Sequence, residues 1–255
     1  MSATGVSAPT IARPRAPGFA SKTLALIAKD LRIELRARDT LPPMLAFSLA
    51  VTLLLAFTLP SSTAPADPVD LPVGTVPLND VLAGFLWIKI LFAGLVGFAR
   101  TFEVERREGA IDSLLLVPVD RSALFIAKAT ANLTFVVLVE VFLVPLFLLL
   151  FQVDVAADWW LLVAVLLLGD IGFVSVGTLF ASLAARTTSR ELMLPILALP
   201  VLVPLFIAGV EMTSDLFATG AAESITDKGW FVILLAFDAI IGIVGALVFE
   251  FALDN

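Results

Sequence analysis

Long apolar segments alternate with short polar connections along most of this chain. Six of the segments are near or above the roughly 20 residues that an α-helix needs to cross the ~30 Å hydrocarbon core of a bilayer. They lie at about 41–60, 81–100, 122–151, 160–184, 192–211 and 229–251. The pattern predicts an all-α, polytopic membrane protein in which six transmembrane helices form a single transmembrane domain over 22–255.

The region before the first apolar segment divides into two parts. Residues 1–21 are rich in Pro, Ala and Ser without apolar periodicity, so we expect a disordered tail on the cytoplasmic side and no signal peptide. Residues 22–39 place apolar side chains at helical spacing beside basic ones, which predicts an amphipathic helix lying in the membrane interface. Its apolar positions are Leu24, Ile27, Leu31 and Leu35.

Composition agrees with a membrane protein and excludes several kinds of chemistry. The chain is 60% hydrophobic and 15% charged, whereas soluble domains are usually about 25% charged. It contains no Cys, His or Tyr, which excludes disulfides, thiol catalysis, Cys/His zinc sites and histidine general bases. The formal net charge of -7 argues against a nucleic-acid partner, since phosphate binding needs a basic surface.

Basic residues concentrate in alternate connections. Lys and Arg occur in the N-terminal region, in the second connection and in the fourth, whereas the first and third connections have none and the fifth has only Lys228. Because positive charge marks cytoplasmic loops, both termini are expected in the cytoplasm and the protein in the cell membrane. The basic residues are Arg13, Arg15, Lys22, Lys29, Arg32, Arg36, Arg38, Arg100, Arg106, Arg107, Arg121, Lys128, Arg186 and Arg190.

Four ionisable residues interrupt the apolar segments: Lys89, Glu140, Asp170 and Asp238. At ~1.5 Å per residue, each lies roughly 13–18 Å from the outer end of its segment, so the sequence predicts one polar layer near the bilayer middle. A charge there costs at least ~2.5–3.5 kcal/mol unless it faces the bundle interior. The layer either fixes helix packing through pairing with Lys89 or lines a path for substrate or protons.

Three prolines, Pro195, Pro200 and Pro204, lie in the fifth segment. Each removes a backbone donor and crowds the preceding turn of a helix. The sequence therefore predicts kinks or a broken helix, with the freed carbonyls satisfied by neighbouring helices.

The connection between the second and third segments contains the most polar run of the chain, EVERREGAIDSLLLVP at 103–118. Its charges are spaced for one face of a helix and its apolar residues form a second stripe. One interpretation is a solvated loop that only carries positive charge. The other is a coupling helix that docks on a cytosolic partner, with coupling residues Glu103, Arg107, Glu108, Gly109 and Asp112.

The longer run FEVERREGAIDSLLLVPVDRSALFIAK resembles the cytoplasmic signature of exporter-type ABC permeases. Within that group, the chain is most similar to the haem exporter protein B (CcmB-type) family of cytochrome c maturation. The interfacial helix and first crossing of that family are similar to the run ALIAKDLRIELRARDTLPPMLAF. Its Pro-rich fifth segment is similar to the run LALPVLVPLFIAGV. The similarity spans about 22–251.

The resemblance implies a six-helix subunit, a homodimer, that works with a separate P-loop ATPase, a second haem-handling membrane subunit and a haem chaperone outside the membrane. The sequence has no G-x-x-x-x-G-K-[ST] motif, so ATP would be bound by the partner, and no enzymatic activity is expected of this chain. Haem is the implied cargo. The chain offers iron only methionines, which are Met1, Met44, Met193 and Met212.

Three other functions fit parts of the pattern. An ABC permease could export a lipid or a drug instead of haem. A proton-coupled secondary transporter would use the intramembrane acids and the Pro-rich segment as its site. An intramembrane enzyme would need Asp170 and Asp238 to act as a catalytic dyad.

Overall fold

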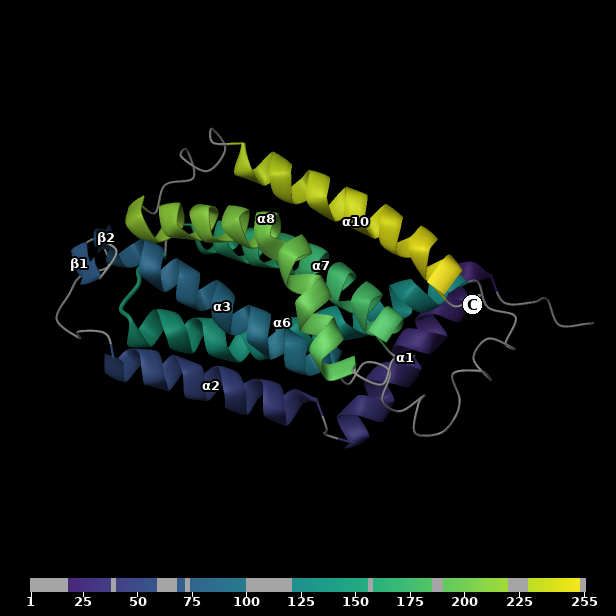
Figure 1. Ribbon diagram of the computed structural model, residues 1–255. Helices are drawn as coiled ribbons and strands as arrows, with labels where there is room; N and C mark the ends of the chain where they lie inside the picture. Colours follow the sequence, from purple (N-terminus) through teal and green to yellow (C-terminus); the bar gives the residue numbers. More distant parts are fainter. Residues whose placement is uncertain are drawn as a thin grey trace, which may run out of the picture.

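The computed structural model describes residues 18–37, 40–58, 68–71, 74–99, 121–155, 158–184, 190–219 and 229–252. Within these ranges, six helices are long and apolar enough to cross a membrane, which confirms the expected all-α, polytopic fold. The helices are α1 (Phe19–Ala37), α2 (Leu41–Thr58), α3 (Leu78–Phe98), α6 (Arg121–Leu150), α7 (Trp159–Ala184), α8 (Arg190–Thr219) and α10 (Trp230–Ala252). Figure 1 shows the crossing helices side by side, with α1 lying across one end of the bundle.

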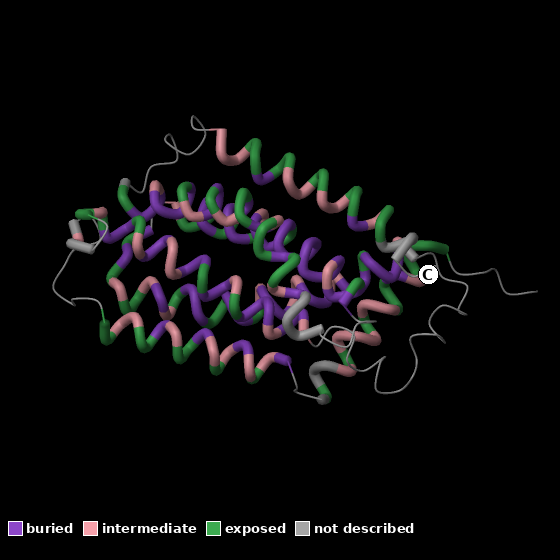
Figure 2. The backbone as a smooth tube through the Cα atoms, in the orientation of Figure 1, coloured by how far each residue is buried: buried purple, intermediate pink, exposed green. Residues whose placement is uncertain are grey.

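Helices α3 and α7 form the centre of the bundle. Their most apolar windows are 61% and 72% buried, whereas those of α2 and α10 are 17% and 11% buried. Figure 2 shows the buried residues gathered between the helices and the exposed ones along the outer sides of α2 and α10. Since the exposed side chains of these two helices are mostly aliphatic or aromatic, their outer faces suit contact with lipid.

One tryptophan of α3 contacts both α7 and α8. Trp87 of α3 lies against Gly169 of α7 and Gly209 of α8, where a Cβ on either glycine would overlap the indole ring. Its indole N–H donates to Thr213 Oγ1 at 2.9 Å, and its ring meets Phe206 edge-on with the centroids 5.6 Å apart. Small residues at helix interfaces permit such close approach in membranes.

The fifth crossing extends further than the apolar pattern indicates. The sequence suggests an end near 211, but α8 continues to Thr219. Asn79, in the first turn of α3, donates to the Ser214 carbonyl at 3.2 Å and to Ser214 Oγ at 2.9 Å, and Ser214 Oγ donates to Asp80. The polar residues after 211 lower the local hydropathy, so the sequence pattern suggests that the helix ends there. In the structure, hydrogen bonds to α3 satisfy the polar groups of Ser214, and the helix continues.

A short β-hairpin joins α2 and α3, where the sequence suggests only a polar connection. Strand β1 (Pro68–Leu71) pairs antiparallel with β2 (Gly74–Pro77), and Val69 lies opposite Val76. Gly74 has φ of 128°, a backbone conformation that glycine adopts without steric cost. The hairpin lies at the end of the bundle opposite α1 (Figure 1).

Candidate functional site

Three of the four intramembrane ionisable residues meet in the bundle interior. Lys89 comes from α3, Glu140 from α6 and Asp170 from α7, and their exposed fractions are 2%, 8% and 0%. Glu140 interacts electrostatically with Lys89 on one side and directly with the Asp170 carboxyl group on the other. We refer to these three residues as the carboxyl cluster. Its members face the protein interior, as expected for charged groups at this depth.

The ammonium group of Lys89 is held by α6. Its Nζ donates to the Leu143 carbonyl at 3.5 Å and lies 4.9 Å from the centroid of the Phe147 ring. A carbonyl dipole and an aromatic face both attract a cation, and more strongly where water is excluded. These contacts hold the cation next to Glu140, which lies one turn before Leu143 on the same helix.

Three of the four carboxyl oxygens in the cluster have no hydrogen-bond donor among the described residues. Both Asp170 oxygens and Glu140 Oε1 are buried without a hydrogen-bond partner in that part of the chain. An ionised carboxylate can only accept, so two carboxylates that face each other cannot satisfy each other. The site therefore requires a donor between or beside the two groups.

Asp238 lies apart from the carboxyl cluster, although its depth is similar. Its carboxyl group packs against Gly172 of α7, where a Cβ would overlap it, next to Phe237. Residues two apart on an α-helix point to nearly opposite sides, so Gly172 and Asp170 face different neighbours. The predicted single layer is thus divided between two sides of α7, and Asp170 and Asp238 do not form a dyad.

A groove of about 360 Å³ runs between α6 and α7 on the surface of the bundle. Of the described residues that line it, Glu140 is the only ionisable one. The other lining residues are Val137, Val141, Val144, Pro145, Leu148, Val155, Trp159, Leu162, Val163, Leu166 and Leu167. Because α6 and α7 are antiparallel, Glu140 lies near one end, beside Leu166 and Leu167, and Trp159 lies near the other. Sequence reasoning did not single out the groove or Pro145, since the lining comes from two helices.

Glu140 also lines a second, much smaller cavity. This cavity holds about 10 Å³ and is shared with Lys89 and Ser48. That is on the order of the space that one water molecule needs. Glu140 thus separates the lipid-side groove from the interior position of Lys89.

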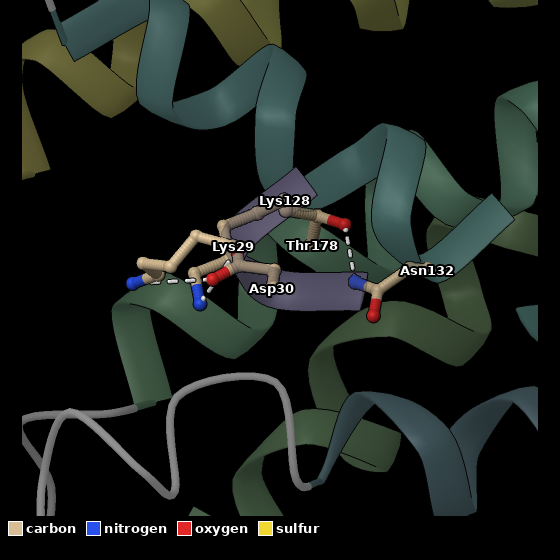
Figure 3. Close-up of polar contacts among 5 residues, drawn as sticks. All are labelled: Lys29, Asp30, Lys128, Asn132 and Thr178. Carbon is tan, nitrogen blue, oxygen red and sulfur yellow. Dashed lines mark hydrogen bonds and ion pairs between the residues drawn. The ribbon is translucent and has the colours of Figure 1, made fainter. Parts of the chain in front are cut away.

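At the end of the bundle where α1 lies, polar contacts join α1, α6 and α7 (Figure 3). Lys128 Nζ of α6 lies 3.1 Å from Asp30 Oδ2 of α1, and Lys29 Nζ lies 3.2 Å from Asp30 Oδ1. Asn132 of α6 donates to Thr178 Oγ1 of α7 at 3.0 Å. Helix α1 covers most of the region 22–39, for which the sequence predicts an amphipathic helix, and it is joined to the third crossing by the Asp30–Lys128 ion pair.

Charge is distributed unequally between the two ends of the bundle. We call the α1 end the basic end because, apart from Lys89, the basic residues in the described ranges belong to α1 or to the first turns of α6 and α8. The opposite, acidic end carries aspartates in strand β1, in the connection between α6 and α7, and near the adjoining ends of α3 and α8. The basic residues are Lys22, Lys29, Arg32, Arg36, Arg121, Lys128 and Arg190, and the aspartates are Asp70, Asp80, Asp154, Asp158 and Asp215.

Helix α8 remains a single helix through Pro195, Pro200 and Pro204. Figure 1 shows that α8 bends along its length, so that the axes of its two halves run in different directions. The three prolines belong to its N-terminal half, where the missing backbone donors make a bend easier. The helix is thus bent without being broken.

The five residues proposed for the coupling stretch, Glu103, Arg107, Glu108, Gly109 and Asp112, lie outside the described residues. Two of the methionines are core residues, because Met44 and Met212 are 1% and 0% exposed. Met1 and the Met193 side chain lie outside the described part. The methionines whose side chains are described therefore serve packing.

Comparison with known proteins identifies the relatives of this chain. A match to the family described as CcmB protein covers residues 21–255. The chain is 33% identical over 192 residues to Heme exporter protein B of Rhodobacter capsulatus, which covers 74% of this chain and 80% of that protein. It is 31% identical over 187 residues to Heme exporter protein B of Paracoccus denitrificans, covering 73% of this chain and 80% of the relative. The chain belongs to the CcmB protein family.

Proposed function

We propose that this chain is the membrane subunit of an ATP-driven exporter that serves haem delivery for c-type cytochrome assembly. The observation that carries the proposal is the docking of α1 on α6 through the buried Asp30–Lys128 ion pair at the basic end of a six-helix bundle. Membership of the CcmB protein family and the names of two curated relatives supply the cargo class.

The arrangement suits coupling to a partner at the basic end. In the sequence, residues 103–118 follow α3 and precede α6, and α1 packs on α6. A partner that moves this segment would act on both helices that hold Lys89 and Glu140. The polar residues Glu103 to Asp112 are our candidates for the docking surface.

Energy is supplied in trans in this proposal. The chain lacks the P-loop motif through which a separate ATPase would bind ATP. It also lacks the His, Cys and Tyr side chains that usually ligate haem iron. We therefore assign ATP binding to an ATPase subunit and iron ligation to a second membrane subunit or an external haem chaperone, and we propose that this chain acts as a homodimer.

The charge distribution supports an orientation. Positive residues gather on the cytoplasmic side of membrane proteins, so the basic end is placed in the cytoplasm of a cell-membrane protein. Helices α1 and α10 both reach this end (Figure 1), which supports the expectation that both termini are cytoplasmic.

The proposal is tested by purifying a tagged copy from native membranes and identifying what accompanies it. A soluble P-loop ATPase should be recovered in stoichiometric amount, and c-type cytochrome maturation should be lost when the ATPase carries a P-loop lysine substitution. Recovery without any nucleotide-binding partner, together with maturation that does not depend on that lysine, would support a proton-driven transporter instead. Dependence on the ATPase with normal cytochromes would indicate a different cargo, such as a lipid or drug.

A further inference from the structure

We propose that Glu140 and Asp170 hold one proton between them, and that this proton-binding site opens to the membrane through the groove between α6 and α7. The inference is independent of the cargo and of the ATPase.

The first step is the balance of donors and acceptors. Both carboxyl groups are buried, they interact directly, and three of their four oxygens have no donor from any described residue. One proton between them converts an acceptor facing an acceptor into a charge-assisted hydrogen bond. Two carboxyl groups that share a site generally behave this way, since both cannot ionise side by side.

The second step is the balance of charge around α6. Two ionisable residues face Glu140: Lys89 from α3 and Asp170 from α7. Helix α2, which also packs on α6, has no charged residue. Asp238 of α10 faces Gly172, and the charges of α1 lie near Lys128, roughly 18 Å along α6 at ~1.5 Å per residue. With one shared proton, the cluster carries one negative and one positive charge. This neutral state avoids the cost of an unbalanced charge inside the membrane.

The third step is access. Glu140 lines the groove between α6 and α7, whereas Asp170 is fully buried and does not line it. The rest of the lining is apolar, so a small apolar molecule can reach Glu140 from the lipid phase. Glu140 is thus the member of the pair that is open to such a molecule.

The protonation state is tested by infrared spectroscopy of the full chain in lipid nanodiscs. Wild-type protein at neutral pH should show the carbonyl band of a protonated carboxylic acid, and the band should shift in D₂O. Glu140→Gln and Asp170→Asn should each lose that band, because the remaining carboxylate pairs with Lys89. Asp238→Asn is the control and should retain it. A spectrum in which neither Glu140→Gln nor Asp170→Asn removes a carboxylic acid band would overturn the shared proton.

Access is tested with dicyclohexylcarbodiimide, an apolar reagent that reacts with protonated carboxyl groups. Mass spectrometry should locate the adduct on Glu140 and not on Asp170. Val163→Trp, at a groove-lining position, should abolish labelling of Glu140, while Val232→Trp, on the exposed face of α10, should leave it unchanged. Absence of the Glu140 adduct in wild-type protein, or equal labelling in both tryptophan variants, would contradict access through the groove. This measurement needs no substitution in the cluster, so it remains decisive if the cluster variants fail to fold.

Discussion

Asp30 of α1 and Lys128 of α6 form an ion pair of 3.1 Å in which the side chains are only 10% and 6% exposed. The pair fastens an amphipathic helix to a membrane-crossing helix at the basic end. The same crossing helix carries Glu140, three turns further on. The contact therefore connects the surface of the bundle with the carboxyl cluster through one continuous helix.

Removing one partner of this ion pair should destabilise the protein. Asp30→Asn is expected to lower the free energy of unfolding by about 3–5 kcal/mol, because it removes the carboxylate that lies 3.1 Å from the buried ammonium group of Lys128. Lys29→Met is the control: Lys29 is 41% exposed and its pair with Asp30 should contribute less than about 1 kcal/mol. Thermal unfolding in detergent measures both, and equal midpoints for the two variants would argue against a structural role for the buried pair.

The packing of the Trp87 ring against Gly209 should not tolerate an added methyl group. Gly209→Ala would place a Cβ 2.6 Å from Trp87 Cζ2, and the resulting overpacking is expected to cost about 1–3 kcal/mol. Gly84→Ala is the matched control on α3, since its Cβ meets nothing within 4 Å. Denaturation in mixed micelles should show destabilisation only for Gly209→Ala; a stable Gly209→Ala protein would show that the helices can separate at little cost.

The hydrogen bond from Asn132 to Thr178 should contribute modestly to the packing of α6 on α7. Interhelical hydrogen bonds in membranes are worth about 0.6 kcal/mol on average. A double-mutant cycle with Asn132→Ala and Thr178→Val should give a coupling energy of that order. Thr134→Val, which removes only a bond to the Thr130 carbonyl of its own helix at 2.8 Å, should show no coupling to Thr178→Val.

Either reversing a charge or adding bulk in the coupling stretch should disable the protein without unfolding it. Glu108→Lys and Gly109→Leu are expected to abolish c-type cytochrome maturation at unchanged membrane abundance, with less ATPase recovered on purification. Asp154→Lys, at the exposed acidic end, should behave as wild type and controls for charge reversal as such. Normal maturation in both coupling variants would favour the solvated-loop interpretation.

Orientation can be measured directly because the chain has no cysteine. Asp154→Cys should react with a membrane-impermeant maleimide applied from outside intact cells or spheroplasts. Ser21→Cys on α1 should react only after the membrane is opened. The opposite result would place the basic end outside and overturn the proposed topology.

The amino-acid sequence determined the number of crossings, their approximate limits and the amphipathic character of α1. These features depend on local hydrophobic length and periodicity, which a chain expresses wherever it packs. The resemblance to the CcmB family was also readable from short motifs, and the family match over residues 21–255 confirms it.

Only the tertiary structure decided how the polar residues group. Sequence position predicts one depth for Lys89, Glu140, Asp170 and Asp238, but their grouping depends on how each helix is rotated about its axis. That rotation is fixed by close contacts such as Trp87 against Gly169 and Gly209, which come from three separate helices. The groove that reaches Glu140 arises in the same way, because its walls belong to two helices that packing brings together.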